Sequence, residues 1–174
     1  MGQRSSGSLH KSERTLVAVL ANPRPRDGSR TEKRIALVRD ALGYERAEIV
    51  NLFSRASESS REIAVLGVSA EGWREARVSV SEAIASADSV LLGFGLIPSS
   101  RESRPHLRAQ LEWLRHELQV HGHLQVWQVG DRPRHPSRWH QYVSDTHGRT
   151  VGGTFEQRLK QVLRTVPLND CRWA

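Results

Sequence analysis

Apolar residues in this chain fall into short, β-branched runs that alternate with longer stretches of helical periodicity. The short runs have the length of buried strands and stop at polar or glycine residues, whereas the longer stretches repeat apolar residues every three or four positions. The order predicts one α/β domain, a three-layer sandwich around a mainly parallel, roughly four-stranded sheet. The predicted strands are residues 15–21, 48–53, 89–94 and 124–129, and the predicted helices are residues 30–42, 79–87, 105–121 and 154–163.

Three predicted helix starts carry the spacing of a capping box, in which a Ser or Thr side chain caps the helix and a Glu or Gln follows three residues later. Between residues 54 and 78 the pattern is irregular and predicts a long connection over the sheet. We interpret Trp73 in this connection as a packing anchor rather than a lid. The capping pairs are Ser29 with Glu32, Ser79 with Glu82, and Thr154 with Gln157.

The domain prediction is a disordered tail at residues 1–13, a single domain at residues 14–166 and a C-terminal tail at residues 167–174. The lone cysteine, Cys171, excludes an intramolecular disulfide and a cysteine-based zinc site, which fits a reducing compartment. No apolar run approaches membrane-spanning length, and no signal-peptide core follows the N-terminus. We therefore expect a soluble, cytoplasmic protein without a membrane partner.

A formal net charge of +7 changes this picture, because arginine carries almost all of it. The planar fork of arginine matches phosphate and carboxylate oxygens better than the point charge of lysine does. We expect nucleic acid or a nucleotide as the partner, and the oligomeric state stays open. His116, His121 and His123 invite a metal interpretation, but no acidic ligand is fixed nearby, so neither a metal nor a cofactor is expected.

Candidate site residues follow the ends of the four predicted strands. In a parallel sheet these ends share one edge, where ligands bind. The chain has no Ser-His-Asp elbow, no phosphate-loop Gly-Lys-Ser/Thr and no Gly-x-Gly-x-x-Gly opening a helix, which disfavours nucleotide-dependent transfer. The candidates are Asn22, Arg24, Arg26, Asp27 and Arg30 after the first strand, Asn51 and Phe53 on the second, Gly93 and Gly95 at the third, and Arg132, Arg134, His135, Ser137, Arg138 and Trp139 after the fourth.

Six short motifs occur along residues 15–142: Asn22-Pro23, Thr31 with Lys33-Arg34, Val50-Asn51-Leu52-Phe53, Ala87-Asp88, Phe94-Gly95 and Pro133-Arg134-His135-Pro136. Together these motifs resemble the domain of unknown function 1643 family. The chain departs from that family at two places: Arg24-Pro25-Arg26 replaces small polar residues after Asn-Pro, and Val80-Ser81 lies near the place of an Asn-Asp pair.

The same order of motifs is similar, more distantly, to the uracil-DNA glycosylase superfamily. That resemblance implies a water-positioning residue at Asn22, an amide at Asn51 that reads the pyrimidine edge, and a His-Pro-Ser loop at residues 135–137 that stabilises the departing base. The base-stacking aromatic expected near the first loop is not evident, and Arg138-Trp139 replaces the wedge residue.

Three hypotheses follow. In the first, the protein is an N-glycosidase: Asn51 binds the base edge, His135 donates to the developing anion, and Asn22 or Asp27 positions water. The arginines then hold phosphates, and Trp139 stacks or wedges. In the second, the fold is a non-catalytic nucleic-acid or nucleotide-binding module in which the arginine loops hold the ligand while Asn22 and His135 brace loops. The third is an enzyme acting on a free nucleoside or another small metabolite.

Overall fold

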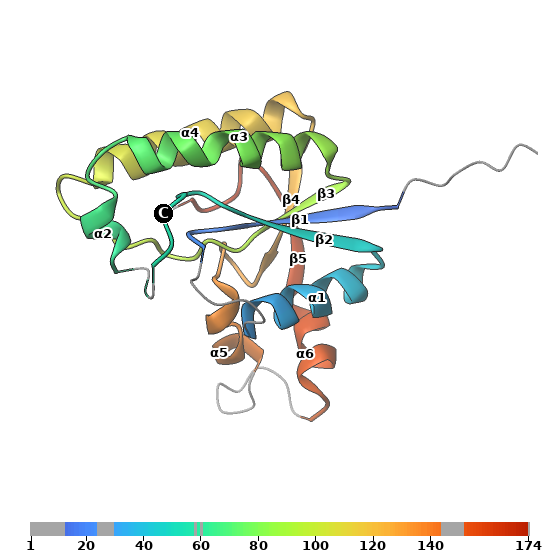
Figure 1. Ribbon diagram of the computed structural model, residues 1–174. Helices are drawn as coiled ribbons and strands as arrows, with labels where there is room; N and C mark the ends of the chain where they lie inside the picture. The colour runs from blue at the N-terminus through green and yellow to red at the C-terminus, as the bar shows by residue number, and fades with distance from the viewer. Residues whose placement is uncertain (1–12, 24–29, 58, 60, 144–151, 174) are drawn as a thin grey trace, which may run out of the picture.

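The computed structural model describes residues 13–23, 30–57, 59, 61–143 and 152–173. Its centre is a five-stranded sheet in the order β2-β1-β3-β4-β5 (Figure 1), in which β1 to β4 are parallel and β5 is antiparallel to β4. The predicted mainly parallel sheet is confirmed, and the fifth strand is an addition. The strands are β1 (Thr15–Leu20), β2 (Arg46–Asn51), β3 (Ser89–Leu92), β4 (Gln125–Val129) and β5 (Leu163–Pro167).

Helices cover both faces of the sheet. In Figure 1, α3 and α4 lie above it, while α1, α5 and α6 lie below. The short α2 stands beside the carboxyl ends of the parallel strands. The bounds are α1 (Arg30–Leu42), α2 (Ile63–Leu66), α3 (Glu71–Ser86), α4 (Arg104–Val120), the 3-10 helix η1 (Pro136–Arg138), α5 (His140–Val143) and α6 (Phe155–Val162).

Strand β1 is buried on both faces because it lies inside the sheet between two helical layers. Its side chains alternate between the layers: Leu16 packs in the same apolar cluster as Trp139, and Val17 packs in the cluster that contains Trp73. All four side chains are at most 2% exposed. The leucines predicted to form a stripe on α4 pack in the cluster that contains Trp73.

The helix predicted at residues 79–87 is present, but the prediction of its first residue was wrong. Helix α3 starts at Glu71, so Ser79 lies in its interior, where its hydroxyl donates to the carbonyl of Ala76 at 3.1 Å. A serine inside a helix often bonds back to the preceding turn in this way. Ser79 and Glu82 have the three-residue spacing of a capping box, but both lie in the interior of α3.

Close packing around Phe53 explains the earlier start of α3. A Cβ on Gly72 would lie 2.6 Å from the Phe53 ring, so only glycine lets α3 approach this closely. The Trp73 ring lies 4.8 Å from that of Phe53, and its indole N–H donates to the carbonyl of Gly67 at 3.0 Å. Trp73 is thus a packing anchor, as predicted.

The C-terminal part of the chain turns from helix directly into strand. The capping box of Thr154 and Gln157 is confirmed at the start of α6. Leu163, predicted to be helical, is the first residue of β5. Leu168 and Cys171, in the segment predicted as a tail, are buried in the core beneath α4. The Ser29 cap and residues 1–12 of the predicted N-terminal tail lie outside the described residues.

Candidate functional site

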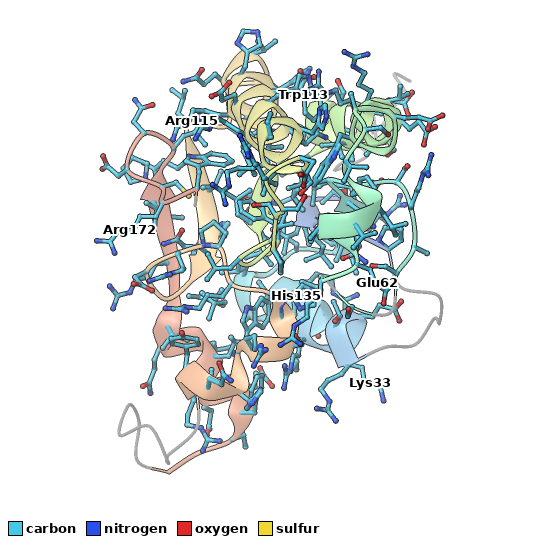
Figure 2. All side chains as sticks on the ribbon, turned by 90° about the vertical axis from the view of Figure 1, so that its left-hand side faces the viewer. Lys33, Glu62, Trp113, Arg115, His135 and Arg172 are labelled. Carbon is cyan, nitrogen blue, oxygen red and sulfur yellow. The ribbon has the colours of Figure 1, made fainter. Side chains whose placement is uncertain are left out.

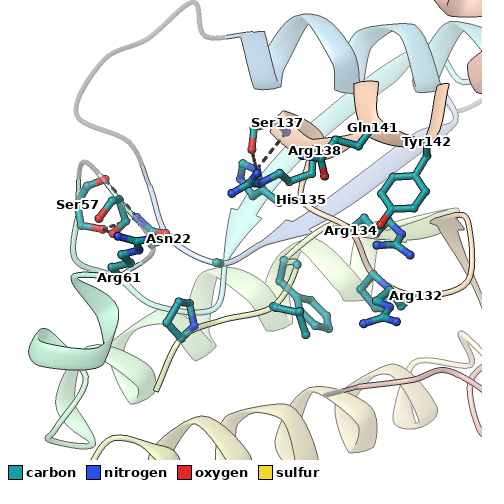
Figure 3. A pocket seen from close by; sticks show the side chains of 17 residues that line it. Asn22, Ser57, Arg61, Arg132, Arg134, His135, Ser137, Arg138, Gln141 and Tyr142 are labelled. Atoms are coloured by element: carbon teal, nitrogen blue, oxygen red, sulfur yellow. Dashed lines mark hydrogen bonds between the residues drawn. The ribbon is translucent and has the colours of Figure 1, made fainter. Parts of the chain in front are cut away.

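A pocket of about 510 Å³ opens where the parallel strands end (Figure 3). Ala21 and Asn22 reach it from the end of β1, and Phe94 and Gly95 reach it from the end of β3. The chain runs from β1 to β2 on one side and later places β3 on the other side of β1. This reversal of strand order creates a crevice at the carboxyl edge, the usual ligand position in open α/β sheets.

The loop after β4 forms the opposite wall of the pocket and is shaped by His135. The imidazole caps η1, because its Nδ1 accepts from the backbone N–H of Ser137 at 3.2 Å. The Ser137 hydroxyl also lies 2.9 Å from Nδ1 (Figure 3). A neutral imidazole that accepts at Nδ1 carries its proton at Nε2. His135 lines the pocket, and in this tautomer its N–H donor is Nε2.

Arg34 of α1 ties this loop to the rest of the fold. Its guanidinium donates a hydrogen bond to the carbonyl of Pro136 and lies 5.2 Å from the ring centre of Phe155. Burial lowers the pKa of Arg34, and the charge of Arg30 lowers it further. An arginine nevertheless stays protonated at neutral pH, so the bond to the loop is charge-assisted.

Gly95 is the point at which the loops after β3 and β4 meet. Its φ of +71° is a left-handed conformation that glycine adopts at low cost. A Cβ at this position would lie 3.0 Å from the Cβ of His135 and 3.1 Å from its backbone nitrogen. The glycine therefore allows His135 to sit directly against the β3 end.

Asn22 fixes the loop that contains Ser57. Its Nδ2 donates to the Ser57 hydroxyl at 2.7 Å and lies 3.1 Å from the carbonyl oxygen of Pro23 and 3.4 Å from that of Ser57. The Ser57 hydroxyl in turn donates to the carbonyl of Ser59 at 2.9 Å. With its amide N–H groups engaged, Asn22 can offer a ligand or a water only the Oδ1 acceptor.

The pocket is electropositive. Arg61, Arg132, Arg134 and Arg138 line it, and no carboxylate lines it within the part of the chain that the structure describes. Arg61 and Arg138 are exposed and form no ion pair with the described residues. Arginines without a local counter-charge attract anionic ligands.

Asp131 pairs with two of these four arginines, Arg132 and Arg134. Its carboxylate lies 2.5 Å from Arg134 and 3.8 Å from Arg132. Burial raises the pKa of Asp131, but the hydrogen bond from Arg134 and the two positive charges outweigh that effect and hold the pKa below its usual value. Arg134 also stacks on Tyr142, 3.5 Å from the ring centre, which holds its guanidinium at the pocket wall.

Many of the residues predicted from the strand ends meet in this one pocket. Three others cannot be placed, because Arg24, Arg26 and Asp27 lie outside the described residues. Arg30 is exposed at the start of α1 and does not line the pocket. The residues brought together are Asn22, Gly95, Arg132, Arg134, His135, Ser137 and Arg138.

Other predicted site residues are structural in this fold. Trp139 is fully buried and its indole N–H donates to the carbonyl of Arg134 at 2.7 Å, so it cannot stack on a base or wedge a duplex. Phe53 is fully buried against Trp73. Gly93 is buried beside Leu20 and Pro136. Apolar packing removes all three from contact with a ligand.

Asn51 ends β2 at the same sheet edge but does not line the pocket. Its Oδ1 is buried and accepts no hydrogen bond from any residue the structure describes. The sequence also missed several residues that do line the pocket, namely Ser57, Arg61, Gln141 and Tyr142. Arg61 and Tyr142 could have been proposed from the sequence, because one is a cation and the other an aromatic residue close to a predicted loop.

Neither a metal centre nor a membrane span occurs within the described ranges. No three His, Cys, Asp or Glu side chains there are arranged to hold a metal ion. His121 lies 3.3 Å from Glu117, and His123 lies 2.9 Å from the carbonyl of Ile84. None of the described helices has the length and apolar character needed to cross a membrane.

Comparison with known families gives one informative result. No curated protein and no solved structure matches the chain. The family model described as protein of unknown function (DUF1643) matches residues 6–137, which include β1 to β4 and the pocket wall as far as Ser137. This range is well over half of the 174 residues, so the chain belongs to the DUF1643 family.

Proposed function

We propose that the pocket at the end of β1 and β3 binds one nucleotide unit. The observation that carries the proposal is the set of four arginines around a cavity that no described carboxylate lines. Guanidinium groups bind phosphate oxygens with paired, charge-assisted hydrogen bonds. The phosphate of the nucleotide is therefore the group that this wall recognises.

The other walls suit the remainder of a nucleotide. Ala21 and Phe94 are buried apolar residues in the pocket lining, and Gln141 and Ser137 add polar groups. A cavity of about 510 Å³ falls within the range typical of small-molecule sites. Apolar surface on one side and cations on the other match a base and its phosphate.

Calorimetric titration with a nucleoside monophosphate and the corresponding nucleoside tests this proposal. We expect the monophosphate to bind at least tenfold more tightly, and Arg138→Ala to weaken it by about tenfold, because a hydrogen bond to a charged group contributes roughly 1.5–3 kcal/mol. Arg46→Ala is the matched control: Arg46 is exposed at the first residue of β2, at the opposite sheet edge. Equal affinity for nucleoside and monophosphate would refute the proposal.

One observation favours a second candidate, hydrolytic release of the base. Because Nδ1 of His135 accepts from the Ser137 N–H, a neutral His135 carries its proton at Nε2. When the glycosidic bond breaks, its electron pair moves to the base, water adds to the sugar carbon, and the proton of that water passes to solvent. A donor at His135 would stabilise the negative charge on the base. The resemblance to the uracil-DNA glycosylase superfamily assigns this role to the same residue, with Asn22 as the water-positioning partner.

Released base, measured by chromatography after incubation with modified-base oligonucleotides and free nucleosides, tests the second candidate. His135→Ala should lower the rate by about two to three orders of magnitude. His135→Asn separates catalysis from bracing, because asparagine is a good cap that lacks the imidazole donor. Under catalysis both variants are slow, whereas under bracing His135→Asn restores activity and melting temperature. If the wild-type protein releases no base, only the binding function stands.

A further inference from the structure

A second hollow lies beyond the nucleotide pocket, between α4 and the C-terminal segment. It has a volume of about 420 Å³ and is lined by Leu107 and Leu111 from α4, by three arginines and by Trp173. The arginines are Arg104, Arg108 and Arg115. Apolar and cationic side chains therefore share this hollow, as they do in the nucleotide pocket.

A smaller hollow of about 160 Å³ lies between the two. It shares Phe94, Leu96 and Arg132 with the nucleotide pocket and shares Trp173 with the hollow on α4. Arg172 adds a further cation to its wall. The three hollows therefore adjoin one another, and we call this row of hollows the groove; Figure 2 is turned toward this side of the molecule and labels His135, Arg172 and Arg115.

The arginines of α4 lie along one side of this helix. Positions 104, 108 and 115 differ by four and seven residues, which are spacings of a single helical face. At 1.5 Å per residue they extend over about 16 Å. Arg104 and Arg108, together with Arg101 just before the helix, are exposed and form no ion pair with any described residue. Glu112 is the one carboxylate among the described residues that line the hollow on α4.

The smaller hollow places apolar side chains between the two sets of cations; Phe94 is 3% exposed, so Leu96 and Trp173 are the ones that a ligand can touch. The rings of Phe94 and Trp173 stack with centroids 6.1 Å apart and planes inclined by 21°. Leu96 is 68% exposed on the connection after β3, although it lines two of the hollows. An exposed leucine between two cationic hollows provides a contact for the flat face of a base.

We propose that this groove binds a single-stranded nucleic acid, with one nucleotide in the pocket and the adjoining strand crossing Leu96 and Trp173 to the arginines of α4. The proposal rests on the nucleotide-binding function above. A row of cations next to apolar and aromatic side chains is the arrangement by which proteins hold single strands. A duplex is less suited, because a paired base must leave its stack before it enters a pocket.

Fluorescence anisotropy with labelled oligothymidylates of three, six and ten nucleotides tests the groove. Affinity should increase with length, and Arg104→Ala/Arg108→Ala should weaken the ten-nucleotide strand at least tenfold without changing calorimetric binding of thymidine monophosphate. The slope of affinity against salt should fall by about 1.4, because each phosphate contact on a single strand contributes about 0.7.

The control Arg14→Ala/Arg46→Ala removes the same charge just before β1 and at the first residue of β2, and it should keep the wild-type affinity and salt slope. If thymidine monophosphate binds but the α4 variant holds the long strand as the wild type does, the groove is refuted and the nucleotide function stands. If neither ligand binds, the proposed function itself fails. If a duplex or polyglutamate binds as tightly as the ten-nucleotide single strand, and loses affinity in the Arg104→Ala/Arg108→Ala variant, the assignment to single strands is overturned.

Discussion

Substitution of Gly95 by alanine tests whether the contact between the β3 and β4 loops shapes the pocket. The change has two effects in the structure: it forces a side chain into a backbone with φ of +71°, and it places a Cβ 3.0 Å from the Cβ of His135. Carbon atoms attract best at about 3.5–4.0 Å, so this contact is repulsive and one of the loops must move.

Gly122→Ala separates the two effects. Gly122 has nearly the same φ, +77°, but nothing lies within 4 Å of a Cβ built there. The left-handed backbone alone should lower the free energy of unfolding by about 1–2 kcal/mol in either variant. The crowding at Gly95 should add about 1–3 kcal/mol or displace the loop. Because 1 kcal/mol shifts the melting temperature by roughly 2–4 °C at this chain length, calorimetry resolves the difference.

Ligand binding gives the decisive measurement. If the loop moves by even a small distance, the Nε2 donor of His135 and the neighbouring arginines lose their alignment. We expect Gly95→Ala to weaken binding of the nucleoside monophosphate by about tenfold, which corresponds to about 1.4 kcal/mol, while Gly122→Ala binds as the wild type does. A Gly95→Ala protein with wild-type affinity would show that this contact does not set the pocket geometry.

Three further predictions concern buried groups. Arg34→Met removes the donor to the Pro136 carbonyl, so urea denaturation should show a loss of about 1–3 kcal/mol; an unchanged midpoint would refute the role of this bond. Trp139→Phe should cost about 1 kcal/mol in the same assay while oligonucleotide binding keeps its salt slope, and an altered slope would place Trp139 at the interface. Burial raises the pKa of Cys171 to about 11, so the native thiol should react with a disulfide reagent at pH 8 far more slowly than in urea. The stability that this protonated thiol contributes is complete below about pH 9 and is lost toward pH 11, so Cys171→Ala should show a smaller decline between pH 8 and 11, and an equal decline would refute it.

The sequence predicted the fold where the chain alternates buried strands with capped helices. The start of α3 was missed because Gly72 and Trp73 have the sequence pattern of a loop. Their packing against Phe53 accounts for the helical first turn of α3. Strand β5 was missed because it follows α6 without a loop: the C-cap of the helix, Leu163, is also the first residue of the strand.

The positions of polar residues after the predicted strands also located most of the pocket, because the carboxyl ends of parallel strands lie at one edge of the sheet. It could not show which side chains turn inward. Trp139 follows the arginine loop in sequence yet packs in the core, where its apolar surface is buried. The bond from Arg34 to Pro136 joins residues 102 positions apart, and no local pattern signals such a contact.

The composition of the two outermost strands limits how copies of this protein can associate. A free strand edge offers unpaired backbone groups that another chain can extend into a longer sheet. Here β2 carries exposed Arg46 and Glu48 along one edge. At the other edge β5 carries exposed Arg164 and ends at Pro167, which has no backbone N–H to donate. The charged residues at both edges and the proline in β5 oppose pairing of these strands with a second copy. We therefore expect contacts between copies to involve helices and loops.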